Sequence, residues 1–201
     1  SKWVEAETVI ISTGATAKYL GLPSEQKLRG GGVSACAVCD GFFYKNQDVA
    51  IVGGGDTAAE EATYLANICK KVTMLVRKDE MRASKAMQHR VNNTKNLEVR
   101  YNTEVDEVIG DQVVDGLRMV NNKTGEKEEI AITGLFIAIG HKPNTDIFKG
   151  HLDMDDTGYL ITKGKSTKTN IPGVFASGDV QDKEYRPVSY THLTLPTKRI
   201  V

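Results

Sequence analysis

Apolar residues occur along this chain in short runs, which are separated by glycine-rich turns and polar segments. Residues 48–52 and 72–76 are apolar, β-branched runs typical of buried strands. Between them, apolar side chains recur at helical spacing, at Ala58, Ala62, Leu65, Ala66 and Cys69. The pattern predicts a βαβ unit with two parallel strands.

Alternating runs further along the chain predict a small antiparallel ribbon. They lie at Leu97–Tyr101, Val105–Val108 and Val113–Asn121, with a turn at residues 122–125. A fully apolar run then predicts a buried strand at Leu135–Ile139. Short strands that end on glycine are expected at residues 8–14 and 171–179. The fold class is α/β, with a Rossmann-like domain flanked by parts of a second domain.

Composition narrows the classes of function. The chain has 201 residues, 40% of them hydrophobic, and 26 basic residues balance 26 acidic ones. A neutral chain offers no global positive field for nucleic acid or an anionic membrane, and its longest apolar run is far shorter than the roughly 20 residues that cross a bilayer. Three cysteines and no apolar leader favour a reducing cytoplasm over secretion.

The turn after the first strand of the βαβ unit has the pattern of a dinucleotide-binding loop. Its residues are Gly53, Gly54, Gly55, Asp56 and Thr57, followed by Ala58. The first glycine permits the tight turn, the third lets a pyrophosphate approach the backbone, and the alanine allows close packing of helix on sheet. The alternative is a glycine-rich turn that binds no ligand.

Basic residues follow the second strand of the same unit. Arg77, Lys78 and Arg82 stand where an NAD-specific site would carry an acidic residue. Cations at this place favour a ribose 2′-phosphate and therefore NADPH. The alternative is a basic turn that faces only water.

A close pair of cysteines precedes this unit. Cys36 and Cys39 have the spacing of a dithiol that exchanges electrons through a mixed disulfide, and Asp40 could move the proton. A zinc site would need two further ligands, and no histidine pair has metal-ligand spacing, so no metal is expected. Cys69 is expected on the inner face of its helix. Gly178 and Asp179 end the last strand, where the carboxylate could bind a cofactor hydroxyl or simply cap a turn.

Together these motifs resemble the low-molecular-weight thioredoxin reductases of bacteria, flavoproteins with two dinucleotide-binding domains. The resemblance covers about 185 of the 201 residues, in the family's order. It rests on residues 12–14, 36–43, 53–58, 77–82, 138–144 and 178–180.

The resemblance implies that NADPH reduces FAD, that FAD reduces the disulfide of Cys36 and Cys39, and that the dithiol reduces thioredoxin. It makes Asp40 the acid–base partner of the dithiol. It also implies an NADPH domain at residues 18–146, inserted in an FAD domain that comprises residues 1–17 and 147–186. The cofactor-binding residues that it adds to the glycine turn and the basic residues are Gly14, Ile139, Gly140, Gly178, Asp179, Val180 and Arg186.

The chain departs from the family pattern in three places. The N-terminal FAD fingerprint is absent, residues 187–201 do not continue as the helix that caps the flavin and joins the homodimer, and the expected His-Arg-Arg run reads Val76-Arg77-Lys78. We therefore expect an inactive fragment with an incomplete FAD site and a tail foreign to the fold. The alternatives are the flavoprotein of an alkyl hydroperoxide reductase and a non-catalytic NADPH-binding module.

Overall fold

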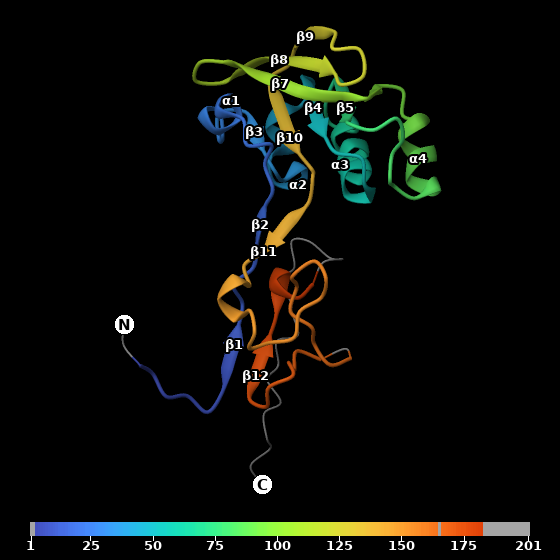
Figure 1. Cartoon of the computed structure of the whole chain (residues 1–201). Helices are drawn as coiled ribbons and strands as arrows, with labels where there is room; N and C mark the ends of the chain where they lie inside the picture. The colour runs from blue at the N-terminus through green and yellow to red at the C-terminus, as the bar shows by residue number, and fades with distance from the viewer. Residues whose placement is uncertain (1–2, 165, 183–201) are drawn as a thin grey trace. The chain divides into compact units, whose positions relative to one another are not determined.

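A computed structural model describes residues 3–164 and 166–182 of the chain. The chain forms two compact units. The inner unit is one continuous segment, Ala17–Gly140, and the outer unit combines the segments on either side of it, Ser1–Thr16 and His141–Val201. Figure 1 shows the elements of both units.

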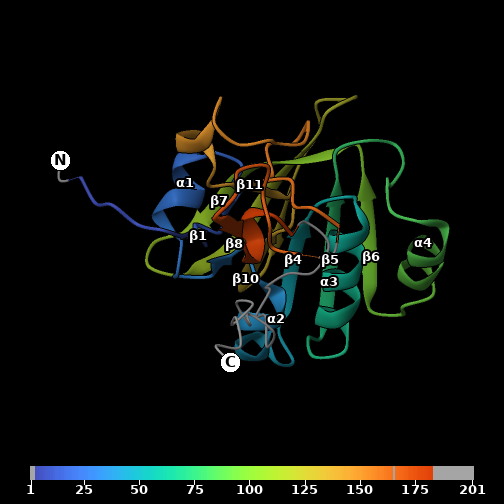
Figure 2. The ribbon, with the colours of Figure 1, turned by 90° about the horizontal axis from the view of Figure 1, so that it is seen from below.

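The inner unit is built on a five-stranded parallel sheet with the strand order β3-β10-β4-β5-β6. Its strands are β3 (Val33–Ser34), β4 (Asp48–Val52), β5 (Lys71–Val76), β6 (Leu97–Tyr101) and β10 (Gly134–Ile137). Its helices are α1 (Pro23–Lys27), α2 (Ala37–Asp40), the 3₁₀ helix η1 (Gly41–Tyr44), α3 (Asp56–Ala66) and α4 (Lys85–Asn92). In Figure 2, α3 lies over β4 and β5, and α4 lies beside β6.

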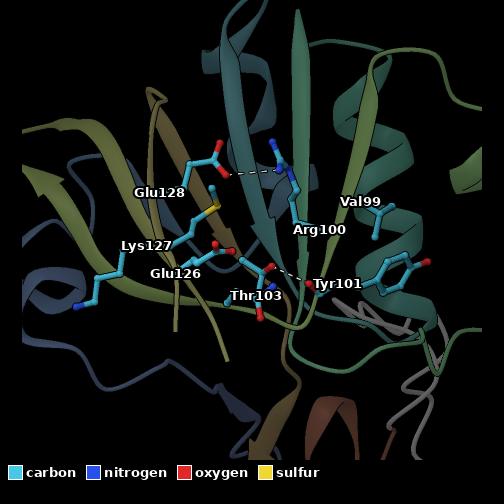
Figure 3. A pocket seen from close by; sticks show the side chains of 9 residues that line it. Val99, Arg100, Tyr101, Thr103, Glu126, Lys127 and Glu128 are labelled. Atoms are coloured by element: carbon cyan, nitrogen blue, oxygen red, sulfur yellow. Dashed lines mark hydrogen bonds and ion pairs between the residues drawn. The ribbon is translucent and has the colours of Figure 1, made fainter. Parts of the chain in front are cut away.

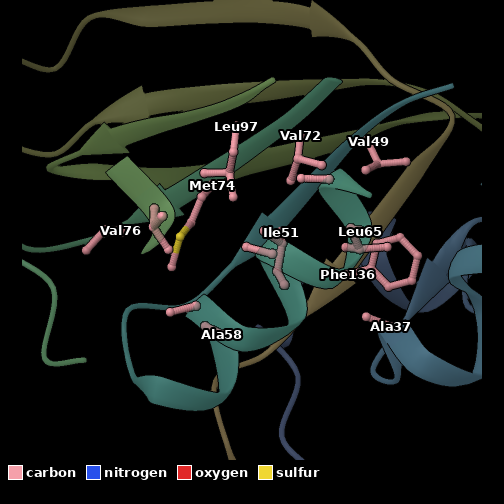
Figure 4. Close-up of a cluster of buried hydrophobic side chains, with 14 of the residues drawn as sticks. Ala37, Val49, Ile51, Ala58, Leu65, Val72, Met74, Val76, Leu97 and Phe136 are labelled. Atoms are coloured by element: carbon pink, nitrogen blue, oxygen red, sulfur yellow. The ribbon is translucent and has the colours of Figure 1, made fainter. Parts of the chain in front are cut away.

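Both faces of this sheet are covered, which is why its central strands read as continuous apolar runs. Ile51 and Met74 point toward α3 and join its buried alanines and Leu65 in one cluster (Figure 4). Their neighbours Val52 and Leu75 point to the opposite face. Alternate residues of one strand therefore fill two separate cores, and the predicted βαβ unit is confirmed as β4-α3-β5.

A three-stranded antiparallel ribbon covers the second face. It consists of β7 (Thr103–Gly110), β8 (Val114–Asn121) and β9 (Lys127–Ala131), in that order. The prediction that Leu97–Tyr101 belongs to this ribbon is wrong, because that segment pairs in parallel with β5. Its apolar side packs against the cluster under α3, and a period of two does not reveal whether a strand's partner runs parallel or antiparallel.

The helix of the βαβ unit is shorter than its apolar pattern suggests. It ends at Ala66, with Asn67 as its C-cap. Cys69 is buried as expected, but it lies in the turn beyond the helix, so its placement on the helix is wrong. Burial raises the pKa of this thiol to about 11, which makes it a poor nucleophile at neutral pH.

The outer unit holds a small parallel pair of strands, β1 (Val9–Ile11) and β12 (Val174–Ala176). Its 3₁₀ helices are η2 (Asp146–Phe148) and η3 (Gly178–Val180), and its core is made by Ile11, Leu152, Leu160, Ala176 and Val180. A further two-stranded pair joins β2 (Ala15–Ala17) to β11 (His141–Pro143). The strand expected at residues 171–179 is thus confirmed as β12, and Gly178 follows it at the start of η3.

Candidate redox and nucleotide-binding site

The parallel sheet brings the chemistry of the inner unit to one edge. The carboxyl ends of parallel strands lie along the same edge of a sheet, where α/β proteins commonly bind ligands. Cys36 follows β3, Ile139 and Gly140 follow β10, Gly53 follows β4 and Arg77 follows β5. Segments that are far apart in the chain therefore meet at neighbouring strand ends.

The two cysteines of the inner unit are joined in a disulfide at the start of α2. Cys36 is the N-cap of this short helix, and its Sγ accepts a hydrogen bond of 3.2 Å from the backbone N–H of Cys39. Cys36 is half-buried, whereas Cys39 is exposed. The bond is therefore formed within one turn of backbone and can be reached by a reaction partner.

Asp40 is tied to this disulfide through a serine that the sequence analysis did not single out. The hydroxyl of Ser34 donates to Oδ2 of Asp40 at 2.6 Å, and the backbone N–H of Cys36 donates to the same hydroxyl oxygen at 3.1 Å. The carboxylate is half-buried. Burial, and then the charge of Asp40, raise the pKa of Tyr44. Asp40 is thus held one hydroxyl away from the backbone of Cys36.

In the glycine turn, the first residue has no room for a side chain, whereas the third residue faces open space. A Cβ on Gly53 would lie 2.4 Å from the carbonyl oxygen of Ala138 and 2.6 Å from Cβ of Ala58, and φ at Gly53 is +152°. A Cβ on Gly55 would meet nothing within 4 Å. Gly55 is the N-cap of α3, and Asp56 and Thr57 form the exposed start of that helix. The open space beside this helix start fits a pyrophosphate, which the N–H groups of a helix N-terminus favour.

The basic segment after β5 is anchored to this glycine turn. The carbonyl oxygen of Gly54 accepts hydrogen bonds from the backbone N–H groups of Arg82 at 2.7 Å and Ala83 at 3.0 Å. The Asp56 carboxylate accepts from the N–H of Ser84 at 2.9 Å, and this bond lowers the pKa of Asp56. The tether holds Arg82 beside the turn.

The three basic side chains themselves are exposed. Across residues 3–164 and 166–182, no ion pair within 4.0 Å engages Arg77, Lys78 or Arg82. The carbonyl oxygens of Arg77 and Lys78 are held by Asn122 at 2.8 Å and Asn102 at 3.0 Å. The backbone of the segment is therefore fixed, while its guanidinium and ammonium groups are available to a phosphate.

The expected flavin-binding residues of the outer unit also gather at strand ends. Gly14 follows β1, and Gly178 and Asp179 follow β12, which is parallel to β1. Both glycines have positive φ, +70° and +78°, in the left-handed region that favours glycine. Val180 packs its side chain into the core of the unit. Arg186 and the predicted tail at residues 187–201 lie outside the described residues.

A separate hollow of about 570 Å³ lies between β6 and the ribbon (Figure 3). Arg100 and Glu128 form an ion pair of 3.5 Å across it. It is lined by Val99, Arg100, Tyr101, Thr103, Met119, Asn121, Glu126, Lys127 and Glu128. Because none of the expected site residues contributes to it, we assign it no role.

Comparison with known proteins decides the family. The family model described as pyridine nucleotide-disulphide oxidoreductase matches residues 1–193. The chain belongs to this family. The match covers both units and includes the disulfide and the glycine turn, so the resemblance found in the sequence is confirmed.

Relatives and solved structures agree with this membership. The chain is 54% identical to a thioredoxin reductase of Streptomyces clavuligerus over 181 aligned residues. The alignment covers 90% of this chain and 56% of that protein. It is 42% identical to the crystal structure of a thioredoxin reductase from Streptococcus pyogenes, with a TM-score of 0.80, over 89% of this chain and 58% of that one. A thioredoxin reductase from Giardia duodenalis gives a TM-score of 0.81 at 42% identity, over 89% and 59%. The chain therefore spans less than two thirds of each relative.

The described residues form neither a membrane-spanning helix nor a cluster of metal ligands. Among the described helices, none is long and apolar enough to cross a membrane. Within the same residues, no group of three or more histidine, cysteine or acidic side chains could hold a metal ion. The family's cofactors are a flavin and a pyridine nucleotide, and the open turn at Gly55 suits the latter.

Proposed function

We propose that this chain carries the disulfide centre and the NADPH-binding domain of a thioredoxin-disulfide reductase. The observation that carries the proposal is the common sheet edge, where the Cys36–Cys39 disulfide, the open glycine turn and the exposed basic segment follow strands β3, β4 and β5 of one parallel sheet. Electrons would pass from NADPH through FAD to the disulfide and on to thioredoxin. The names of the relatives favour thioredoxin over the partner of an alkyl hydroperoxide reductase.

Under this proposal each residue of the inner unit has a task. The first turn of α3 from Gly55 receives the pyrophosphate, and Arg77, Lys78 and Arg82 bind the 2′-phosphate. Ile139 and Gly140 border the nucleotide at the end of β10. Bound NADPH supplies a hydride and bound FAD supplies two-electron redox chemistry. One cysteine attacks or is attacked by the partner's sulfur and the other resolves the mixed disulfide, while Asp40 holds or delivers the proton.

The proposed domains differ from the two compact units at their second boundary, which the proposal puts after residue 146, whereas the inner unit ends at Gly140. We assign NADPH binding to residues 18–146 and FAD binding to residues 1–17 and 147–186. Gly14, Gly178, Asp179, Val180 and Arg186 would contribute to the flavin site. A homodimer and a cytoplasmic location remain predictions, and sedimentation of the full-length protein would test the first.

The test of the proposal is thioredoxin turnover with NADPH, measured in a protein of the relatives' full length that contains this chain. We expect electrons to reach thioredoxin and NADPH to be preferred to NADH. Activity toward a peroxiredoxin-type partner without activity toward thioredoxin would select the hydroperoxide reductase instead. Nucleotide binding without reduction of either partner would indicate a non-catalytic NADPH-binding module.

The glycine turn gives a matched pair of variants. Gly55→Ala should leave the free energy of unfolding nearly unchanged, because its Cβ meets no atom within 4 Å. The same methyl group would occupy the place of the pyrophosphate, so NADPH affinity should fall about tenfold or more. Calorimetric titration of the 201-residue chain with NADPH, together with urea unfolding, measures both quantities.

Gly53→Ala provides the contrast. Its Cβ would overlap backbone and side-chain atoms that cannot move independently, so it should destabilise the inner unit by on the order of 3 kcal/mol. If Gly55→Ala bound NADPH as well as the unchanged chain, the nucleotide would not lie at this turn.

Exposed apolar side chains lie close to the disulfide in the chain and suit a protein partner. Val38 is 61% exposed, Phe42 69% and Phe43 74%. Large apolar side chains in such positions commonly mark interaction sites. Phe42→Ala is therefore expected to raise KM for thioredoxin about tenfold and to leave reduction of a small aromatic disulfide unchanged.

Steady-state assays with both substrates separate docking from chemistry. Val113→Ala, which removes an apolar side chain that is 57% exposed between β7 and β8, is the control. An equal loss of activity on both substrates would mean that Phe42 acts on the disulfide itself and not on docking.

A further inference from the structure

Glu61 lies on the face of α3 that packs against the disulfide-bearing segment. Its neighbours Ala62 and Leu65 are fully buried, whereas the preceding Glu60 is exposed. Helices α2 and α3 are in direct contact, and Figure 4 shows Ala37 of α2 near Leu65 of α3. An acidic side chain at the border of an apolar cluster is costly unless it is paired.

The carboxyl group of Glu61 is only partly satisfied. The backbone N–H of Ala37, the residue directly after Cys36, interacts with this carboxyl group and favours its charged form. The carboxyl oxygen Oε2 is enclosed and has no hydrogen-bond partner in the described part of the chain. The contact therefore joins a half-buried carboxyl group to the first residue of the helix that begins at the disulfide.

Burial dominates the protonation of this group. It raises the pKa of Glu61 to about 7, the charge of Glu60 adds to the increase, and the bond from Ala37 opposes it. Near neutral pH, a small change in local charge would therefore change how many protons the carboxyl binds.

We propose that Glu61 is a positioning residue for the redox reaction, and that its carboxyl takes up a proton when the Cys36–Cys39 disulfide is reduced and releases it when the disulfide re-forms. The inference deepens the proposed function and rests on it for its biological role. Reduction breaks the S–S bond with two electrons, which come from a dithiol reagent or from the reduced flavin of the full-length protein. The electrons leave negative charge on sulfur, and a thiolate beside Ala37 favours the neutral form of Glu61.

Other titratable groups surround the same elements. Among the described residues, Glu60 is the one whose charge acts on the Glu61 carboxyl while the disulfide is intact. The elements that pack against α3, and α3 itself, carry the further groups Cys39, Asp40, Asp48, Asp56, Tyr64, Lys71, Lys85, His89, Arg90, Glu98, Arg100 and Tyr101, and Tyr44 lies in η1, which packs against α2. The linkage must therefore be tested at Glu61 itself.

The experiment is the pH dependence of the disulfide's reduction equilibrium in the 201-residue chain. The chain is equilibrated with reduced and oxidised dithiothreitol from pH 5.5 to 8.5, and free thiols are counted after alkylation. Glu61→Gln keeps an acceptor for the N–H of Ala37 but cannot ionise.

Above about pH 8, the disulfide of the Glu61→Gln variant should be reduced on the order of tenfold more readily than that of the unchanged chain, which is equivalent to about 30 mV. Below about pH 6 the two should agree, because Glu61 is then neutral in both redox states.

Glu60→Gln is the matched control: it removes an exposed carboxylate one position away whose charge raises the pKa of Glu61, so it should move the pH-dependent step to lower pH without abolishing it. The proposal would be overturned if the reduction equilibrium constants of Glu61→Gln and the unchanged chain differed by the same factor at every pH. It would also be overturned if the two were equal at every pH. Carbon-13 NMR of the Glu61 carboxyl in the unchanged chain gives a second measurement, with a titration midpoint about one pH unit higher after reduction. An identical midpoint in both redox states would refute the linkage. Neither measurement uses NADPH, FAD or thioredoxin, so a failed proposed function would be recognised separately by the turnover assay.

Discussion

Replacing Cys36 or Cys39 by serine is expected to lower thioredoxin reduction by on the order of 10³-fold or more in a protein of the relatives' full length. In the proposed relay, hydride transfer from NADPH to the flavin would use the two nucleotide sites and not the cysteines, so flavin reduction should persist. Disulfide exchange needs one thiol to attack and another to resolve the mixed disulfide, and the two cysteines are bonded to each other at the start of α2. Stopped-flow absorbance of the flavin and a thioredoxin turnover assay separate the steps.

Cys69→Ser is the control for this pair. The Cys69 thiol is buried, forms no disulfide, and has a pKa raised to about 11 by burial. Its replacement should cost some stability and leave the disulfide exchange intact. A Cys36→Ser protein that still turned over thioredoxin would refute the proposed relay, whereas loss of flavin reduction would show that the substitution had damaged the fold.

The double variant Arg77→Ala, Arg82→Ala is expected to weaken NADPH binding on the order of 10²-fold and to change NADH binding much less. The two nucleotides differ by one phosphate, and a charge-assisted hydrogen bond contributes roughly 1.5–3 kcal/mol. Arg82 is held beside the glycine turn through its backbone, and Arg77 follows the adjacent strand. Titration of the 201-residue chain with each nucleotide measures the difference.

Arg90→Ala removes an exposed arginine from α4 and serves as the control for net charge. It should leave the preference for NADPH in place. Equal losses for both nucleotides in the double variant would mean that these residues support the loop and do not bind the 2′-phosphate. No loss for either nucleotide would leave the basic segment as a solvated turn.

Local sequence patterns were sufficient to predict much of the fold of the inner unit. The apolar run at Asp48–Val52, the glycines after it and the helical spacing from Ala58 all act within one short stretch of chain, so the βαβ unit could be predicted. The two errors, one of strand pairing and one of helix end, have local causes as well. The alternation at Leu97–Tyr101 carries no information about the direction of its partner, and the turn that ends α3 has no glycine or proline to mark it.

The sequence by itself determined the α/β class, the family and the residue types of the site, because short-range periodicity and motif spacing are properties of consecutive residues. Only the tertiary structure decided which of these residues share a sheet edge, since that depends on the strand order β3-β10-β4-β5-β6. It also placed Ser34 between Asp40 and Cys36, and Glu61 against Ala37. The contact of Glu61 with Ala37 follows from packing α2 on α3, and burial changes the protonation of a carboxyl group in a way that no pattern of neighbouring residues reveals.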